Sequence, residues 1–180
     1  SYTGHSQAVG LSSGTDALLA TFLALQLTAG PFDKLLPGDE VLTTPFTFIS
    51  TATSVLRAGL RPVFADLAPR SFSPSLEQSQ AARTPRTRAV LVVHLFGEPL
   101  DLTALKAWCD AEGLVLVEDC AQAIGARFAD GQHVGTKGLA GALSFFPAKN
   151  LGALGDGGAC LTNDAALAKR VTEVRQHGCA

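Results

Sequence analysis

The chain has 180 residues, of which 47% are hydrophobic and 17% are charged, and its formal net charge is −2. This length suits one well-buried domain and is short for two. The balance of 14 Lys+Arg against 16 Asp+Glu leaves no basic excess of the kind that binds nucleic acid or anionic membranes. No apolar run reaches the roughly 18 residues of a membrane span. We therefore expect neither a nucleic acid nor a membrane as partner.

The cysteines and the two ends of the chain suggest where the protein works and how complete it is. The four cysteines have no CxxC-type spacing: Cys109, Cys120, Cys160 and Cys179. We expect free thiols in a reducing compartment and, without a signal peptide, a cytoplasmic protein. Methionine is absent, and the chain ends just after a helix-like segment. We interpret residues 1–180 as one domain of a longer protein, lacking an N-terminal segment and a C-terminal small domain.

Short β-branched and apolar runs alternate along the chain with longer segments of helical period. This alternation is typical of a three-layer α/β/α fold with a mixed, mostly parallel sheet. Seven strands are expected, at Ala8–Ser12, Glu40–Thr44, Arg61–Asp66, Ala89–Leu95, Leu114–Glu118, Ala142–Phe146 and Gly158–Thr162. The last two strands are joined only by the loop Pro147–Asp156, which is short for a parallel crossover. We therefore expect the last strand to run antiparallel to its neighbours.

Helices are expected between most of these strands, and glycines mark two of their ends. The helical segments are Thr15–Leu27, Phe48–Arg57, Leu102–Glu112 and Ala165–Gln176, with a shorter one at Leu76–Ala82. Gly59 and Gly113 follow two of them as expected C-terminal caps. The Pro-containing segment Ala29–Asp39 and the Ser/Pro/Arg-rich segment Arg70–Arg88 are expected to be loops.

Lys149 lies in an unusual place for a lysine. It follows the apolar strand that ends near Phe146, and it precedes a loop with four glycines. A desolvated lysine amine is a good nucleophile toward an aldehyde, and glycines allow a backbone to pack close to a flat cofactor. The alternative is a surface lysine in a flexible loop, and the position of the lysine alone leaves both interpretations open.

Two acids end another apolar strand. Glu118 and Asp119 follow Val115-Leu116-Val117, so at least one carboxylate is expected at the carboxyl edge of the sheet, where ligands bind in open α/β folds. A carboxylate there can pair with a protonated pyridine nitrogen. The alternative is an acidic residue that caps the following helix.

Two strand-to-helix turns also have residue types that suit a cofactor site. Ser12–Leu18 is a turn of small hydroxylated residues before a helix, which suits a phosphate group, although an ordinary capped turn has the same composition. Thr44–Phe48 brings two aromatic rings to a strand end, as core residues or as a stacking partner for a planar ring. Few cofactors other than pyridoxal 5′-phosphate (PLP) need a lysine, an acid, a phosphate turn and a stacking ring together.

In this order, these segments resemble the DegT/DnrJ/StrS sugar aminotransferases, which are PLP enzymes of fold type I. The matching runs are Ser12–Leu18, Pro37–Val41, Thr44–Phe48, Glu118–Ala123 and Ser144–Gly158. The resemblance covers nearly the whole chain, and it is most specific around Lys149. It implies a large PLP-binding domain, a nucleotide-linked keto sugar as substrate, an amino-acid donor (usually L-glutamate), and a homodimer when the protein is full length.

The resemblance also implies a role for each matching residue. Lys149 forms the Schiff base with PLP and shuttles a proton between substrate and cofactor. Asp119 faces the pyridinium nitrogen, and Gln122 approaches the 3-hydroxyl of the ring. The remaining residues hold the phosphate or stack on the ring: Gly14, Thr15 and Ser144 bind the phosphate, and Phe48 stacks, with Phe46 as the second choice.

Three other functions compete with this interpretation. A PLP-dependent sugar dehydratase of the same family is disfavoured because such enzymes replace the lysine at position 149 with histidine. A regulatory protein of PLP fold without turnover is disfavoured by the intact set of Lys149, Asp119 and Gln122. A Rossmann-type dehydrogenase requires a GxGxxG fingerprint, which the sequence lacks.

Overall fold

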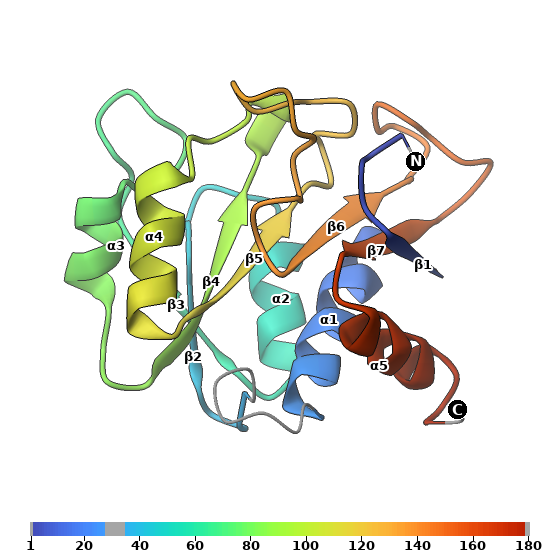
Figure 1. Ribbon diagram of the computed structural model, residues 1–180, viewed down its shortest axis with the longest axis horizontal. Helices are drawn as coiled ribbons and strands as arrows, with labels where there is room; N and C mark the ends of the chain where they lie inside the picture. Colours follow the sequence, from blue (N-terminus) through green and yellow to red (C-terminus); the bar gives the residue numbers. More distant parts are fainter. Residues whose placement is uncertain (1, 28–34, 179–180) are drawn as a thin grey trace.

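The computed structural model describes residues 2–27 and 35–178, which form a sheet between two layers of helices (Figure 1). The strands are β1 (Gln7–Leu11), β2 (Glu40–Thr43), β3 (Arg61–Phe64), β4 (Thr87–Val93), β5 (Val115–Asp119), β6 (Ala140–Ser144) and β7 (Gly158–Thr162). The helices are α1 (Gly14–Gln26), α2 (Ser50–Arg57), α3 (Leu76–Ala82), α4 (Thr103–Glu112) and α5 (Ala165–Arg175), with a 3-10 turn at Leu95–Gly97. Every expected element is present. Most of the expected loop at 29–39 lies outside the described residues, as does Cys179.

The sheet has the order β1-β7-β6-β5-β4-β2-β3. The pairs β3/β2, β2/β4, β4/β5 and β5/β6 are parallel, whereas β7 is antiparallel to both β6 and β1. The expected antiparallel last strand is therefore confirmed. As a result, the carboxyl ends of five neighbouring parallel strands meet at one edge of the sheet.

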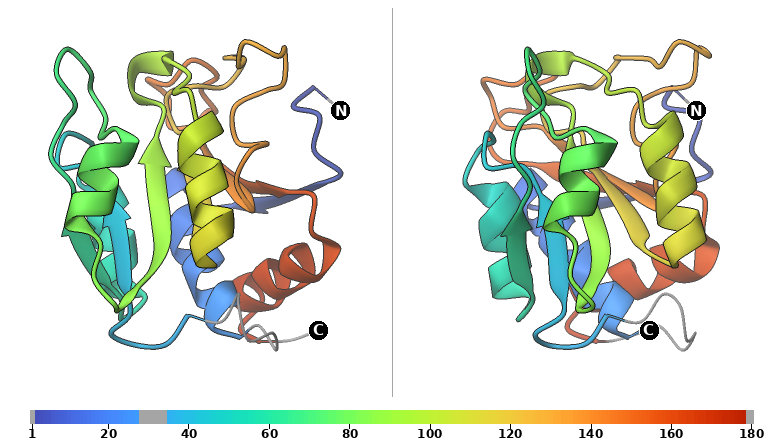
Figure 2. Two further views of the ribbon diagram at one scale, coloured as in Figure 1. Left: turned by 60° about the vertical axis from the view of Figure 1, so that its left-hand side comes forward. Right: turned by 90° about the vertical axis from the view of Figure 1, so that its left-hand side faces the viewer.

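Helices cover both faces of the sheet, so the strands are buried on both sides (Figure 2). On one face, Phe22 of α1 and Val171 of α5 pack with Val117 of β5. On the other, Cys109 of α4 packs with Leu116 of β5. Alternate residues of β5 thus point to opposite faces, as the pleat of a strand requires. None of the described helices is long and apolar enough to cross a membrane.

The helix ends follow from local chemistry. The Ser13 side chain accepts the Asp16 N–H at the start of α1, and the Asp164 carboxylate accepts two N–H groups at the start of α5. Gly59 and Gly113 have φ angles of 76° and 63° just after α2 and α4. The two expected glycine caps are therefore confirmed.

One strand boundary differs from the sequence prediction in a way that matters for the site. The predicted strand Ala142–Phe146 in fact runs from Ala140 to Ser144, so Phe145 and Phe146 lie in the β6–β7 loop. Because Ala and Gly are weak strand formers, the sequence pattern does not predict that β6 begins at Ala140. Gly141 is needed there because a Cβ atom would lie 2.8 Å from the Gly135 Cα.

Candidate active site

A cavity of about 780 Å³ opens at the carboxyl edge of the sheet. Its walls come from the N-terminal turn of α1, the segment before α2, the ends of β4, β5 and β6, and the β6–β7 loop. The volume is typical of a site for a cofactor or small molecule. All seven residues predicted for the site line this cavity: Gly14, Thr15, Phe48, Asp119, Gln122, Ser144 and Lys149.

Lys149 is the one cationic side chain among the described residues that line the cavity. It is half-buried, and its backbone N–H donates to the Phe146 carbonyl at 2.8 Å. Its ammonium group has neither a hydrogen bond nor an ion pair within the described part of the chain. The lysine is therefore held by its backbone while its amine remains available to a ligand.

Two of the glycines in this loop serve the packing of the chain itself. A Cβ atom on Gly152 would lie 2.5 Å from the Pro147 carbonyl oxygen, and one on Gly158 would lie 2.2 Å from the Ser13 carbonyl oxygen. The Gly158 contact brings the start of β7 against the turn that begins α1. These glycines therefore set the loop next to the α1 N-terminus, and of the four glycines from Gly152 to Gly158 only Gly157 lines the cavity.

Asp119 is 4% exposed and lies at the end of β5. Its Oδ2 atom accepts the Thr51 hydroxyl at 2.9 Å, and its Oδ1 atom accepts the Ala121 N–H at 3.1 Å. Burial raises the pKa of this carboxyl above its ordinary value, while the two hydrogen bonds and the charge of Lys149 act in the opposite direction. A cation placed beside Asp119 would stabilise its ionised form.

Gln122 is oriented by the backbone of Phe96. The Phe96 N–H donates to the Gln122 Oε1 atom at 2.8 Å. The side-chain NH₂ group of Gln122 is then the donor that remains for a ligand in the cavity. The amide therefore suits an oxygen acceptor, such as a ring hydroxyl or phenolate.

The predicted phosphate residues come together where α1 meets β6. A Cβ atom on Gly14 would lie 2.7 Å from the Ser144 Cβ, so only glycine allows the helix to start so close to the strand. The hydroxyl-bearing residues Thr15 and Ser144 both line the cavity there. An N-terminal helical turn with hydroxyl groups beside it is suited to an anion.

The two candidate stacking rings have different surroundings. Phe48 is 65% exposed and lines the cavity. Phe46 does not line it, and its ring instead stacks on Phe72 with a centroid separation of 5.6 Å. The geometry thus supports the first choice, Phe48.

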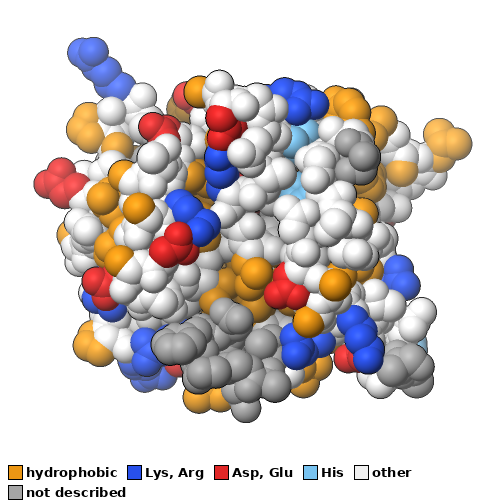
Figure 3. All heavy atoms as spheres, in the orientation of Figure 1, with side chains coloured by type: hydrophobic (Ala, Val, Ile, Leu, Met, Phe, Trp, Pro, Cys, Tyr) orange, Lys and Arg blue, Asp and Glu red, His pale blue; other side chains and the backbone are white. Residues whose placement is uncertain are grey.

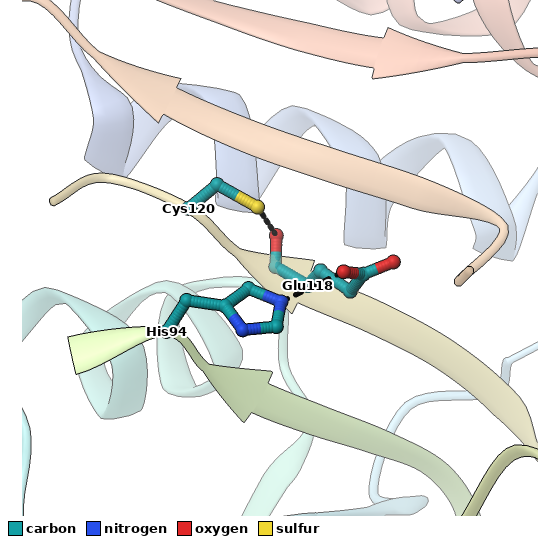
Figure 4. Close-up of side chains that lie close together, drawn as sticks. All are labelled: His94, Glu118 and Cys120. Atoms are coloured by element: carbon teal, nitrogen blue, oxygen red, sulfur yellow. Dashed lines mark hydrogen bonds and ion pairs between the residues drawn. The ribbon is translucent and has the colours of Figure 1, made fainter. Parts of the chain in front are cut away.

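The sequence prediction missed a hydrogen-bond network around Glu118, the residue next to Asp119 in β5, and Figure 4 shows its contact with His94. Glu118 is fully buried, and its carboxylate accepts three hydrogen bonds: from His94 Nε2 at 2.7 Å, from the Gly135 N–H at 2.7 Å and from the Gly138 N–H at 2.5 Å. The Leu100 N–H donates to His94 Nδ1 at 3.2 Å, which fixes the neutral imidazole with its proton on Nε2. The network therefore joins the ends of β4 and β5 to the segment before β6.

His94, Glu118 and Cys120 are close enough together to resemble a metal site. However, the three hydrogen bonds already satisfy the Glu118 carboxylate, and burial raises the pKa of the Cys120 thiol well above its ordinary value. A thiol that stays protonated is a poor metal ligand. We interpret the cluster as a structural network. The signal that predicts it is a polar residue, His94, directly after the apolar run of β4.

The model of the DegT/DnrJ/EryC1/StrS aminotransferase family matches residues 1–180. The chain belongs to this family. It is 46% identical over 98% of its length to the UDP-N-acetyl-3-dehydro-alpha-D-glucosamine 3-aminotransferase of Acidithiobacillus ferrooxidans, and covers 45% of that protein. It therefore spans just under half the length of this relative.

Two solved structures share the fold of this chain. The first is DesV of S. venezuelae in complex with a ketimine intermediate, with a TM-score of 0.90, 40% identity, and coverage of 99% of this chain and 46% of DesV. The second is the E. coli GDP-4-keto-6-deoxy-D-mannose-3-dehydratase with bound hydrated PLP, with a TM-score of 0.89, 29% identity, and coverage of 98% and 44%. The expected three-layer fold with a mixed seven-stranded sheet is confirmed as that of fold-type-I aminotransferases.

Proposed function

We propose that this chain is the cofactor-binding domain of a PLP-dependent aminotransferase that acts on a nucleotide-linked keto sugar. The observation that carries the proposal is the cavity at the carboxyl edge of the sheet. In it, a lysine without a partner among the described residues, a buried carboxylate and the N-terminal turn of α1 line one space. The family relatives support this reaction class.

The residues present fit PLP. Asp119 is a buried carboxylate whose pKa is raised by burial, so a protonated ring nitrogen is the kind of partner that would offset its desolvation. Bound there, the cofactor supplies an electron-withdrawing ring that makes it easier to remove a proton from the carbon bearing the amino group. Asp119 holds the proton on the ring nitrogen and so maintains that property. Lys149 binds the cofactor covalently through its Nζ atom.

The other predicted residues orient the ring. Gln122 donates from its Nε2 atom to the ring oxygen, because Phe96 already occupies its Oε1 atom. Gly14, Thr15 and Ser144 bind the phosphate at the start of α1, and Phe48 stacks on the ring and keeps water from it. With an amino substrate in place, Lys149 would be the group in the cavity that moves a proton to and from the reacting carbon.

The amino donor in this proposal is an amino acid, L-glutamate first, and the acceptor is a keto sugar attached to a nucleotide. The A. ferrooxidans relative is named for a UDP-linked sugar. We propose that residues 1–180 form the large domain of a longer polypeptide, because the relatives are about twice as long as this chain. Further residues would then complete the substrate pocket.

We also propose a homodimer in the cytoplasm. The β6–β7 loop and the segment before α2 expose several large apolar side chains beside the cavity: Phe48, Ile49, Phe146, Leu151 and Leu154. A two-fold partner would cover them. A reducing compartment is supported by the free thiols of the three cysteines that the structure describes.

A sugar dehydratase is the second candidate, because the E. coli structural relative is a dehydratase. The lysine at position 149 argues against it, because the resemblance to the family implies a histidine at this position in its dehydratases. A regulatory protein without turnover is disfavoured because the full set of lysine, acid and glutamine lines one cavity.

The experiment that tests the proposal locates the cofactor on the chain. The complete protein is incubated with PLP, reduced with borohydride and digested, and the peptides are analysed by mass spectrometry. We expect the mass of the reduced cofactor on Lys149, and its loss in Lys149→Ala. Lys137→Ala is the control, because Lys137 pairs with Asp130 outside the cavity. Attachment elsewhere in the wild-type protein, or none, would contradict the proposal.

A further inference from the structure

Three phenylalanine rings follow three neighbouring parallel strands at the carboxyl edge of the sheet. Phe96 follows β4, Phe46 follows β2 and Phe72 follows β3, and these strands are adjacent in the order β4-β2-β3. The rings are 67%, 45% and 46% exposed, respectively. We refer to Phe46, Phe72 and Phe96 as the aromatic ledge. It extends outward from the cavity, because Phe96 also lines the cavity wall.

The rings of the ledge contact one another in a defined geometry. Phe72 stacks on Phe46 with an interplanar angle of 22°, and it meets Phe96 edge-on at 90° with a centroid separation of 5.5 Å. The perpendicular pair forms a corner. A planar heterocycle in this corner can stack on the face of one ring and contact the edge of the other, which are the two arrangements that aromatic groups prefer.

The backbone holds Phe96 in an unusual conformation. Its φ and ψ angles are 56° and 15°, in the left-handed region that a bulky residue rarely adopts. The Gln122 side chain accepts its N–H, and the bond from the Leu100 N–H to His94 closes the turn around it. Because the ring is two-thirds exposed, burial in a core does not explain this strain. Strained residues of this kind cluster at ligand sites.

Phe72 is also held in place by its own turn. The Ala68 N–H donates to the Ser73 carbonyl at 3.1 Å, and the Ser71 N–H donates to the Ala68 carbonyl at 3.0 Å. Ser73 itself is 4% exposed. The ring is therefore presented to solvent from an ordered turn, which lowers the entropic cost of binding a ligand.

We propose that the aromatic ledge is the stacking surface for the heterocyclic base of the nucleotide-sugar substrate. This inference rests on the proposed function, and it names the part of the substrate that each region binds. The sugar end reaches Lys149 inside the cavity, and the nucleotide extends along the same sheet edge toward Phe72. Base–aromatic stacking tolerates different bases, since every base has a flat π face. The ledge therefore supplies affinity for the nucleotide, and it leaves the choice among bases to other contacts.

A second copy of the chain is the other occupant that an exposed apolar ledge could have. The ring geometry favours the base, because the ledge begins at the cavity wall and follows the line of strand ends along which a ligand is bound. The test below separates the two occupants.

The test is calorimetric titration of the complete, cofactor-loaded protein with UDP, dTDP and, as a probe without a base, pyrophosphate. We expect Phe72→Leu to weaken UDP and dTDP binding by about 5- to 100-fold, because it removes the π face and keeps an apolar side chain. Pyrophosphate binding should be unchanged. Phe72→Tyr, which keeps the ring, should retain the nucleotide affinity within about twofold.

The control is Tyr2→Leu, which removes an exposed ring that contacts His133 away from the cavity. It should leave nucleotide binding unchanged. Wild-type affinity for UDP and dTDP in Phe72→Leu would overturn the inference, as would wild-type protein that binds UDP no better than pyrophosphate. Dissociation of a dimer by Phe72→Leu, measured by light scattering, would assign the ledge to a subunit interface instead. In each case, the proposed function stands if PLP is found on Lys149 and amino transfer from glutamate is observed. If PLP is not attached to Lys149 in the wild-type protein, the proposed function itself is overturned.

Discussion

Glu118 and Asp119 are neighbours in the sequence, but β5 directs their carboxylates to opposite faces of the sheet. Asp119 faces the same side as Val117 and receives the Thr51 hydroxyl from α2, and it lines the cavity. Glu118 faces the other side and accepts two backbone N–H groups and His94. The strand pleat therefore separates a ligand-facing acid from a structural one.

The raised pKa of Asp119 makes a pH-dependent prediction for the protein without cofactor. A carboxyl whose pKa is raised by folding destabilises the native state above that pKa, and the penalty disappears as the pH falls through the folded pKa and below the unfolded value of about 4. Asp119→Asn removes this dependence. We expect its melting temperature relative to wild type to rise between pH 4 and pH 7, in thermal unfolding of the complete protein without cofactor.

With the cofactor bound, the difference in melting temperature between Asp119→Asn and wild type should have the opposite sign at neutral pH. The wild-type carboxylate then has a cationic partner, so the wild-type protein should melt higher than Asp119→Asn. A melting-temperature difference that is the same at pH 4 and pH 7 without cofactor would contradict the assignment of Asp119 as the destabilising buried group.

The start of β7 depends on one glycine. A Cβ atom on Gly158 would meet the Ser13 carbonyl oxygen at 2.2 Å and the Gly14 nitrogen at 2.6 Å, and both are backbone atoms that cannot rotate away. We expect Gly158→Ala to destabilise the protein by about 2 kcal/mol or more and to weaken PLP binding, because α1 would have to move. Urea unfolding and a cofactor titration of the complete protein measure the two effects.

Gly10→Ala is the matched control on the neighbouring strand β1. Among the described residues other than its chain neighbours, no atom lies within 4 Å of its hypothetical Cβ, and its φ angle is not positive. Its effect on the free energy of unfolding should stay within about 1 kcal/mol. Equal effects of the two substitutions would show that the contact between β7 and α1 is not tight.

At the level of elements, the sequence predicts most of the fold because its apolar periods and glycine caps are strong. The antiparallel direction of β7 follows from the length of one loop. The start of β6 is not predictable in this way, because Ala140 and Gly141 are weak strand formers that are held in the sheet by pairing with β5 and, at Gly141, also with β7. Local propensity carries no information about such a long-range contact.

The candidate site was predictable to a similar extent. Lysine, acid and hydroxyl groups at strand ends are visible in the sequence, and the parallel sheet brings them into one cavity. The Glu118 network and the strained Phe96 were missed, because they depend on which face a strand residue takes and on one backbone angle. The one departure visible in the sequence is a histidine, His94, directly after the five apolar residues Ala89–Val93.

At the scale of the whole molecule, hydrophobic side chains project from the surface at the upper right of Figure 3, where Figure 1 places the β6–β7 loop, and others lie along the left side and below the centre. Leu154 of this loop is fully exposed, and Leu151 is 55% exposed. We expect the complete protein to have the mass of a dimer in light scattering. Leu154→Asp should shift it toward a monomer, because a charge would be buried at the interface.

Leu56→Asp is the control for that experiment. Leu56 is 56% exposed on α2, and it does not line the cavity. It should leave the mass unchanged. A wild-type protein that is monomeric, loaded with PLP and active would contradict the proposed dimer.

The pairing of β1 with β7 also has a consequence for the order in which the chain can fold. Gln7 pairs with Thr162, and β7 is the one strand with which β1 pairs in the described sheet. On a ribosome, β1 must therefore wait until nearly all of these residues have been synthesised before it can pair with β7. Contacts between such distant segments slow folding, because a long loop must close before they form. The turn that begins α1 directly follows β1 and contacts the start of β7 at Gly158, so we expect the predicted phosphate site to be among the last features of the domain to be completed.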